Sequence, residues 1–266
     1  MSKVKHWYKC AAAIILCFAC LMMGCTNQSL SKEELAKYTE YVCYDSHLVC
    51  LKSGKYLGRT DYPYYREYES SGKKFDYTIT VKLWKISKES EDQFVYAHAF
   101  RPILDVGRRV VMQNPDNYVD VLSTWNIEKL ELYCLDRSDI DKERNPKKKV
   151  IETTSDSTCI SELVSFALSE LDPEKIEKFK TMYSVNSGGY YDFYVRAYFS
   201  ESEYIAWDAE ADLYFDKESE QKLVMLRIGR KSDADLSPNM VKYSIEGYST
   251  LSNWISDAIE AFAAKS

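Results

Sequence analysis

Three residues whose side chains bind metals or form disulfides lie close together early in the chain: Cys43, His47 and Cys50. On one continuous helix they would share a face, a soft-ligand arrangement suited to zinc or copper if a fourth group joins. In that helix the two cysteines would lie about 10 Å apart along the axis, beyond the roughly 7 Å limit for a disulfide. If the helix instead ends near Tyr41, Cys43 and Cys50 can form a disulfide. Buried, idle thiols are the third alternative.

Two further cysteines, Cys134 and Cys159, bring the number that follows residue 25 to four. Four cysteines allow three connectivities, and the pairing of Cys43 with Cys50 and of Cys134 with Cys159 is one of them. Such bonds require an oxidising compartment. The sequence therefore allows two disulfides, and we do not predict a metal site.

The motifs of common enzyme classes are absent. The sequence has no G-x-S-x-G, H-E-x-x-H, P-loop or G-x-G-x-x-G motif, so hydrolases, zinc peptidases and nucleotide binders of those classes find no support. Acidic clusters that begin at Asp139 and Asp233 lack the glycine that a calcium loop needs. Asp208, Glu210 and Asp212 alternate along one expected strand, and we expect them to form a solvated acidic face. We predict no catalytic residue and no cofactor.

Tyrosine is the unusual residue of this chain, with 22 copies. Tyrosine rings supply large contact area with a hydrogen-bonding tip, which suits protein and glycan interfaces. The alternative is structural, because tyrosine is also a good strand former. His98, between Tyr96 and Phe100, is expected to be a packed histidine. Two groups form the possible binding surface: Tyr62, Tyr64, Tyr65 and Tyr68 in an expected loop, and Tyr194, Arg196 and Tyr198 on one strand face.

The elements that must position these residues are mostly strands. A capping box at Ser31 and Glu34 predicts a helix from Lys32 to about Leu51. Apolar residues at helical spacing predict helices at 160–171 and 251–262, and Asp172 with Pro173 opens another. Alternating patterns predict strands at about 75–83, 92–101, 107–113, 118–123, 129–135, 148–153, 190–200, 203–215, 221–230 and 240–246. Because strands arrive in runs, we predict an α+β fold: antiparallel sheet with helices packed on one face.

An internal match suggests a duplication. When Val150–Leu171 is laid over Val241–Phe262, an offset of 91, the apolar positions of the two stripes coincide. This predicts two tandem copies of a β-meander closed by a helix, in units 31–171 and 172–266 that could pack as one domain. Any two amphipathic helices share their apolar spacing, so a chance match is the alternative.

The first 25 residues have the pattern of an export signal. Three lysines and no acid precede an uncharged apolar run from Cys10 to Met23, which is shorter than the roughly 20 residues that span a bilayer. The segment Leu21-Met-Met-Gly-Cys25 resembles the lipobox of bacterial lipoproteins. The resemblance implies a signal peptide at 1–24 and a tether at 25–30. It also implies a diacylglyceryl and palmitoyl-modified Cys25 that anchors the chain in the cell membrane, on the extracytoplasmic face. An uncleaved N-terminal anchor is the alternative.

Composition narrows the function further. The 266 residues carry 35 basic and 41 acidic side chains, a net charge of −6. Removing residues 1–24 takes away three lysines and no acid and lowers this charge to −9. A nucleic-acid partner is therefore not expected. We expect a lipid-anchored, extracytoplasmic, non-enzymatic module of the cell envelope that binds an unknown protein, glycan or other ligand. The alternatives are a cell-envelope hydrolase that uses His98 or His47, and a solute-capture lipoprotein.

Overall fold

The computed structural model describes residue 33 and residues 48–68, 73–99, 110–117, 119–140, 146–169, 182–184, 191–216, 222–228 and 242–265. The predicted signal peptide, the tether with Cys25, the helix expected at Asp172 and the boundary between 171 and 172 lie outside the described residues. So do Cys43 and His47.

No helix among these described residues is long and apolar enough to cross a membrane.

The fold is α+β and mostly strand, as the sequence predicts. All pairings between the described strands are antiparallel. The helices are α3 (Val121–Thr124), α4 (Ser157–Leu168) and α5 (Ser249–Ala263). The strands are β1 (Leu48–Cys50), β2 (Ser53–Tyr68), β3 (Lys73–Ile86), β4 (Phe94–Ala99), β5 (Val110–Gln113), β6 (Ile127–Ile140), β7 (Pro146–Thr154), β8 (Met182–Ser184), β9 (Tyr191–Phe199), β10 (Ile205–Asp216), β11 (Lys222–Arg227) and β12 (Lys242–Ser244).

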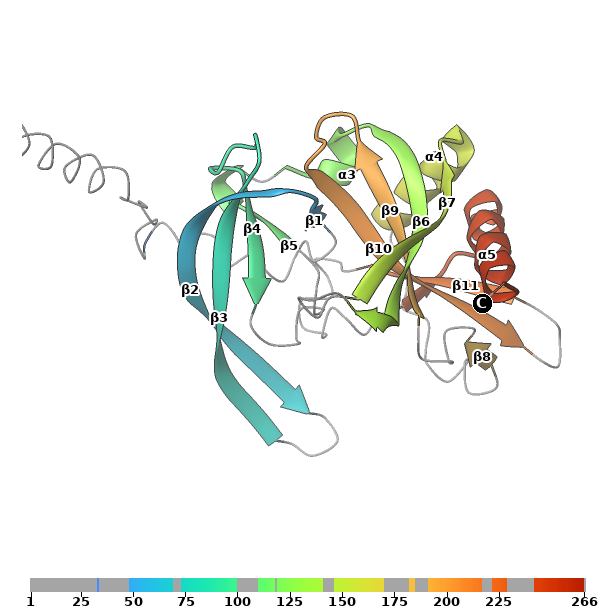
Figure 1. The fold of residues 1–266 in the computed structure, drawn as a ribbon, viewed down its shortest axis with the longest axis horizontal. Coiled ribbons are helices and arrows are strands. Elements are labelled where there is room, and N and C mark those ends of the chain that lie inside the picture. The colour runs from blue at the N-terminus through green and yellow to red at the C-terminus, as the bar shows by residue number, and fades with distance from the viewer. Residues whose placement is uncertain are drawn as a thin grey trace, which may run out of the picture.

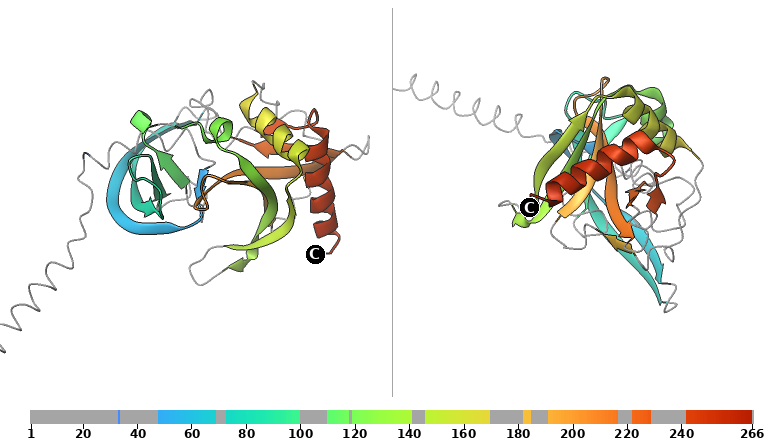
Figure 2. Two further views of the ribbon diagram at one scale, coloured as in Figure 1. Left: turned by 90° about the horizontal axis from the view of Figure 1, so that it is seen from above. Right: turned by 90° about the vertical axis from the view of Figure 1, so that its right-hand side faces the viewer.

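Strand β10 connects the parts of this sheet structure. The strand order is β2-β3-β4-β5-β1-β10-β9-β6-β7; β11 and β8 also pair with β10, and β12 with β11. The first residues of β10 lie between β1 and β9, and its later residues pair with β11 and β8. Figures 1 and 2 show the result as two curved groups of strands, β2 to β5 on one side and β6, β7 and β9 to β11 on the other.

Helices α4 and α5 cover one face of the second group of strands (Figure 1). The side chains that face them alternate along each strand, as the period of two requires. Leu163 and Phe166 of α4 and Ile255 and Ile259 of α5 are almost completely buried in this core. The strand residues of the same core include Leu130, Leu132, Cys134, Phe193, Val195, Ala197, Trp207, Ala209 and Ala211.

A carboxylate accepts hydrogen bonds at the N-terminus of each of these two helices. Asp156 caps α4, because its carboxylate accepts hydrogen bonds from the backbone N–H groups of Thr158 and Cys159 at 2.9 Å. No side chain caps α5 from its own N-cap position. Instead, the Glu162 carboxylate of α4 accepts a 2.7 Å bond from the Leu251 backbone N–H. A carboxylate at a helix N-terminus also opposes the positive end of the helix dipole.

Two hairpins of the chain are each followed by a helix, β6-β7-α4 and β11-β12-α5. When the two hairpin–helix segments are superposed in sequence, their buried residues coincide at an offset of 92 residues, whereas the prediction used 91. An offset of 91 would align buried Phe166 with exposed Asp257. β5 pairs with β4 and β1 and not with β6, whereas β10 pairs with β11, so a complete β-meander is not shared. At 92 the buried residues Leu132, Cys134, Cys159, Leu163 and Phe166 fall on Val224, Leu226, Leu251, Ile255 and Ala258.

Two predictions for the N-terminal part are wrong. The expected helix does not reach Leu51, because Leu48–Cys50 form β1, a buried strand between β5 and β10. The tyrosine-rich segment expected as a loop belongs to β2, which pairs with β3 residue by residue from Gly58 to Tyr68. This strand contains Pro63, and proline is tolerated here because β2 is an edge strand that ends the strand order. Figure 1 shows this hairpin extending past the end of β4.

A third prediction, the strand at 118–123, is also wrong, because Val121–Thr124 form the short helix α3. The Asp120 side chain accepts a 3.3 Å bond from the Ser123 backbone N–H and starts the turn. Strand β8 was not expected. The other predicted strands and the helices at 160–171 and 251–262 are present with boundaries shifted by a few residues.

Candidate functional site

A row of charged side chains crosses the face of the sheet opposite α4 and α5. Backbone register pairs Glu131 of β6 with Arg196 of β9, and Arg196 with Asp208 of β10. The residues on either side of each one point into the helix-covered core, so these three point the other way. Directly paired residues on neighbouring antiparallel strands lie close enough for their side chains to meet. Register alone thus assembles a row of acid, base and acid.

Asp208 is the most deeply buried member of the row, with a fully inaccessible side chain. Arg196 donates two hydrogen bonds to the Asp208 carboxylate, from Nε to Oδ1 at 2.7 Å and from Nη2 to Oδ2 at 2.8 Å. The Tyr133 hydroxyl donates a third bond to Oδ2 at 2.7 Å, and Arg196 Nη2 also contacts that hydroxyl at 3.1 Å. Burial by itself lowers the pKa of Arg196, but the charge and hydrogen bonds of Asp208 outweigh it and raise this pKa. Arg196 therefore carries its positive charge beside Asp208.

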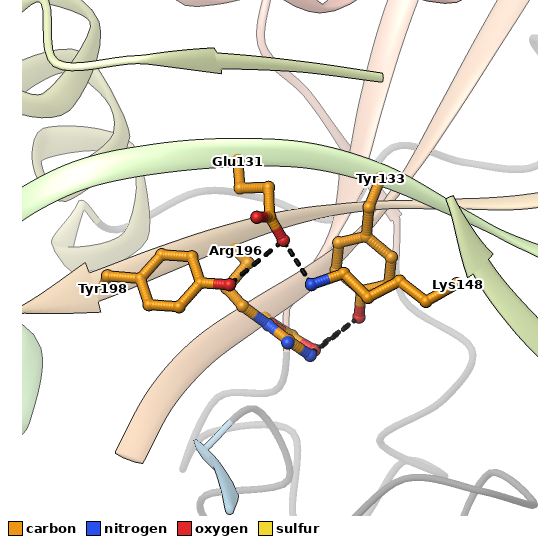
Figure 3. A network of polar contacts seen from close by, with 6 residues as sticks. Glu131, Tyr133, Lys148, Arg196 and Tyr198 are labelled. Atoms are coloured by element: carbon orange, nitrogen blue, oxygen red, sulfur yellow. Dashed lines mark hydrogen bonds and ion pairs between the residues drawn. The ribbon is translucent and has the colours of Figure 1, made fainter. Parts of the chain in front are cut away.

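A second ion pair lies beside the first. The Lys148 ammonium of β7 binds Oε1 of Glu131, and the Tyr198 hydroxyl donates to the same oxygen at 3.1 Å (Figure 3). Burial and the nearby Arg196 charge lower the pKa of Lys148, partly offset by Glu131. Burial and the Glu131 charge raise the pKa of Tyr198. Both shifts follow from packing ionisable groups together away from water.

Tyrosine rings pack against the cations of these ion pairs. The rings of Tyr133 and Tyr194 stack with centroids 5.2 Å apart. Lys148 Nζ lies 4.5 Å and Arg196 Cζ 4.7 Å from the Tyr133 centroid, and both are cation–π contacts. At the rim, exposed Lys129 lies 4.4 Å over the ring of Tyr198. We call Glu131, Tyr133, Lys148, Tyr194, Arg196, Tyr198 and Asp208 the polar cluster.

The polar cluster is closed at one end and open at the other. Side-chain exposure rises from 0% at Asp208 through 9% at Glu131 and 13% at Arg196 to 33% at Lys148. Oε2 of Glu131 and two of the three Lys148 N–H groups have no hydrogen-bond partner among the described residues. The four charged members sum to zero. The open end therefore offers an acceptor and donors in a neutral setting.

The structure unites one of the two predicted tyrosine groups. Tyr194, Arg196 and Tyr198 share a face and belong to the polar cluster. Tyr194 is only 3% exposed, however, so its side chain is not part of an exposed binding surface. The second group, Tyr62, Tyr64, Tyr65 and Tyr68, lies in β2, whose partner strand is β3 and which is not part of the cluster.

The expected solvated acidic face on β10 is also wrong. Asp208 is fully buried and Asp212 is 5% exposed, and Glu210 forms a 3.0 Å ion pair with Arg227. Buried carboxylates persist when cations and hydrogen bonds compensate their lost hydration. The sequence pattern gave the correct alternation, but it could not reveal that Arg196 lies opposite Asp208.

The possible disulfide between Cys134 and Cys159 is absent, because both are free thiols in the core. Cys134 faces the helices from β6 and Cys159 lies in the first turn of α4. Burial raises the pKa of each thiol to about 11, so both act as small apolar residues. Cys50 is buried in β1, and the continuous helix that the metal-site alternative required is interrupted there. Among the described residues, no cluster of His, Cys, Asp or Glu could hold a metal ion.

Sequence reasoning missed Glu131, Tyr133 and Lys148. Glu131 and Tyr133 alternate with Leu130, Leu132 and Cys134, so a polar face on this strand was visible in the pattern. Nothing in the sequence showed that β6 pairs with β9. His98, the candidate histidine for an enzyme, lies opposite Lys82 in β4 and is not part of the polar cluster.

In comparisons with known proteins, no family model, no curated protein and no solved structure matches this chain.

Proposed function

We propose that the protein is a lipid-anchored, extracytoplasmic and non-enzymatic binding module, and that the polar cluster is its ligand site. The supporting observation is the set of hydrogen-bonding groups of Glu131 and Lys148 at the open end of the cluster that have no partner among the described residues. Binding sites combine such a small number of fixed polar groups with aromatic surroundings. The anchor half of the proposal depends on the lipobox resemblance that ends at Cys25.

The geometry favours binding over acid–base chemistry. Both oxygens of Asp208 are engaged by Arg196 and Tyr133, and Glu131 is held by Lys148 and Tyr198. A catalytic carboxylate needs a proton to exchange and a reacting group within reach. The cluster contains no serine, cysteine or histidine. Its rigid ion pairs instead pre-organise the open groups for a ligand.

The anchor is tested by growing cells with alkyne-labelled palmitate and detecting label on the full-length protein. The wild type should be labelled and remain in the membrane fraction, whereas Cys25→Ala should carry no label. Cys20→Ala is the matched control within the same apolar run and should behave as wild type. Equal labelling of Cys25→Ala and wild type would contradict the lipoprotein assignment.

The site is tested by photo-crosslinking in the native envelope. A benzoyl-phenylalanine residue replaces Lys129, which is exposed at the rim of the polar cluster, or Asp257, which is exposed on α5 away from it. Position 129 should yield a specific adduct that position 257 does not, and mass spectrometry identifies it. Adducts at both positions alike, or none at 129, would contradict the assignment of the site.

A further inference from the structure

The charge balance of the polar cluster indicates which ligands it can accept. Two carboxylates, Glu131 and Asp208, face two cations, Lys148 and Arg196, and each cation is already paired. An ionic ligand would bring a net charge to a partly buried site where every opposite charge is used. Such a charge loses hydration without a new counter-ion, which is costly. Lys129, a further cation at the rim among the described residues, is exposed to solvent, where salt and water screen its charge.

The unused groups give the second half of the argument. Oε2 of Glu131 can accept hydrogen bonds, and two N–H groups of Lys148 can donate them. The Tyr198 hydroxyl, which donates to Glu131 Oε1 at 3.1 Å, keeps lone pairs that can accept. Hydrogen-bond donors of Lys148 and acceptors of Glu131 and Tyr198 therefore lie together at the Glu131 carboxylate. A ligand hydroxyl matches this set because it donates one hydrogen bond and accepts others.

Together these features describe a ligand that is uncharged and rich in neighbouring hydroxyl groups. We propose that the polar cluster binds a neutral saccharide, with Glu131, Lys148 and Tyr198 contacting its hydroxyls. Arg196, Asp208 and Tyr133 act as positioning residues, since their bonds to one another hold the row in place. This proposal rests on the proposed function, because it names the ligand class of the same site.

The test uses the full-length lipidated protein in a polyoxyethylene detergent, which has no sugar headgroup, and an array of neutral and acidic glycans. Binding to hits is then measured by calorimetry for wild type, Lys148→Met and Tyr198→Phe. Lys147→Met is the matched control, because Lys147 is the adjacent residue of β7 and is paired with Asp139 on the exposed surface. Thermal unfolding of each variant checks that it is folded.

We expect wild type and Lys147→Met to bind the same neutral glycans. Lys148→Met should weaken that binding about tenfold or more, because it removes hydrogen bonds in which one partner is charged. Tyr198→Phe should weaken it about two- to tenfold, because the hydrogen bond that it removes joins two neutral groups. Tyr198→Phe removes a single oxygen and keeps the inference testable if Lys148→Met is unstable. Absence of neutral glycans among the hits, binding restricted to acidic glycans, or equal affinity in the variants would overturn the proposal. A position-129 adduct that is protein would overturn it while leaving the proposed function standing.

Discussion

Removing Arg196 should destabilise the protein strongly, because it leaves the carboxylate of Asp208 without a counter-charge. Asp208 is fully inaccessible, Arg196 is 13% exposed, and two hydrogen bonds of 2.7 and 2.8 Å join them. Breaking a buried pair by deleting one partner costs about 3–5 kcal/mol. At an m-value of about 2 kcal/mol per M, Arg196→Met should lower the urea unfolding midpoint by about 1.5–2.5 M.

Two comparisons make this prediction specific. Lys88→Met removes a cation from the exposed ion pair with Glu203, whose side chains are 75% and 68% exposed, and it should change the urea unfolding midpoint little. The double variant Arg196→Met/Asp208→Asn removes both charges and keeps an acceptor for Tyr133, so it should recover most of the lost stability.

The pH dependence gives an independent measurement. An unpaired buried carboxylate favours its protonated form, so the deficit of Arg196→Met relative to wild type should shrink as the pH is lowered. A midpoint shift no larger than that of Lys88→Met, or a double variant as unstable as the single one, would refute the reasoning.

Three further predictions follow from other contacts. The two core cysteines, with thiol pKa values near 11, should resist iodoacetamide at pH 8 in the native protein and react after unfolding; rapid native labelling seen by mass spectrometry would contradict their burial. Glu162→Ala should cost about 1 kcal/mol in urea unfolding because α5 loses its N-terminal acceptor, whereas exposed Ser161→Ala should change little. Hydrogen bonds from Lys149 and from Ser138 lower the pKa of Asp136 from 3.8 to about 2, so the stability from this carboxylate is present above about pH 4 and is lost as the pH falls toward 2. An NMR titration should find that low midpoint in wild type and a higher one in Lys149→Met, and equal midpoints would contradict the role of the lysine.

Local patterns predicted the elements whose residues are repeated at one clear spacing. The apolar stripe of α5 and the alternation in β3, β6 and β9 each carry many residues that agree, so single exceptions do not matter. The predictions failed where few residues decide the outcome. Three residues make β1, and its neighbours β5 and β10 stabilise it. Four make α3, where one aspartate cap decides between turn and strand. Such short segments are governed by contacts with distant parts of the chain.

The candidate site shows the same division. Alternation in the sequence correctly separated Tyr194, Arg196 and Tyr198 from their core-facing neighbours on the same strand. It could not place Glu131, 65 residues earlier, or Asp208 on either side of Arg196. The solvent exposure of Asp208 was predicted wrongly for the same reason. A charged residue on a strand is expected to be exposed unless the cation that pairs with it is known.

By itself, the sequence determined which residues share a strand face, which form amphipathic helices and which segment resembles a lipoprotein signal. Each of these properties is local, because it depends on a period of 2 or 3.6 residues or on a short run of side chains. Only the tertiary structure decided that β6, β9 and β10 lie side by side, which makes an ion-paired, neutral cluster out of three separate polar stripes. Strand order depends on long-range packing and register, and no local spacing encodes which partner a strand will find.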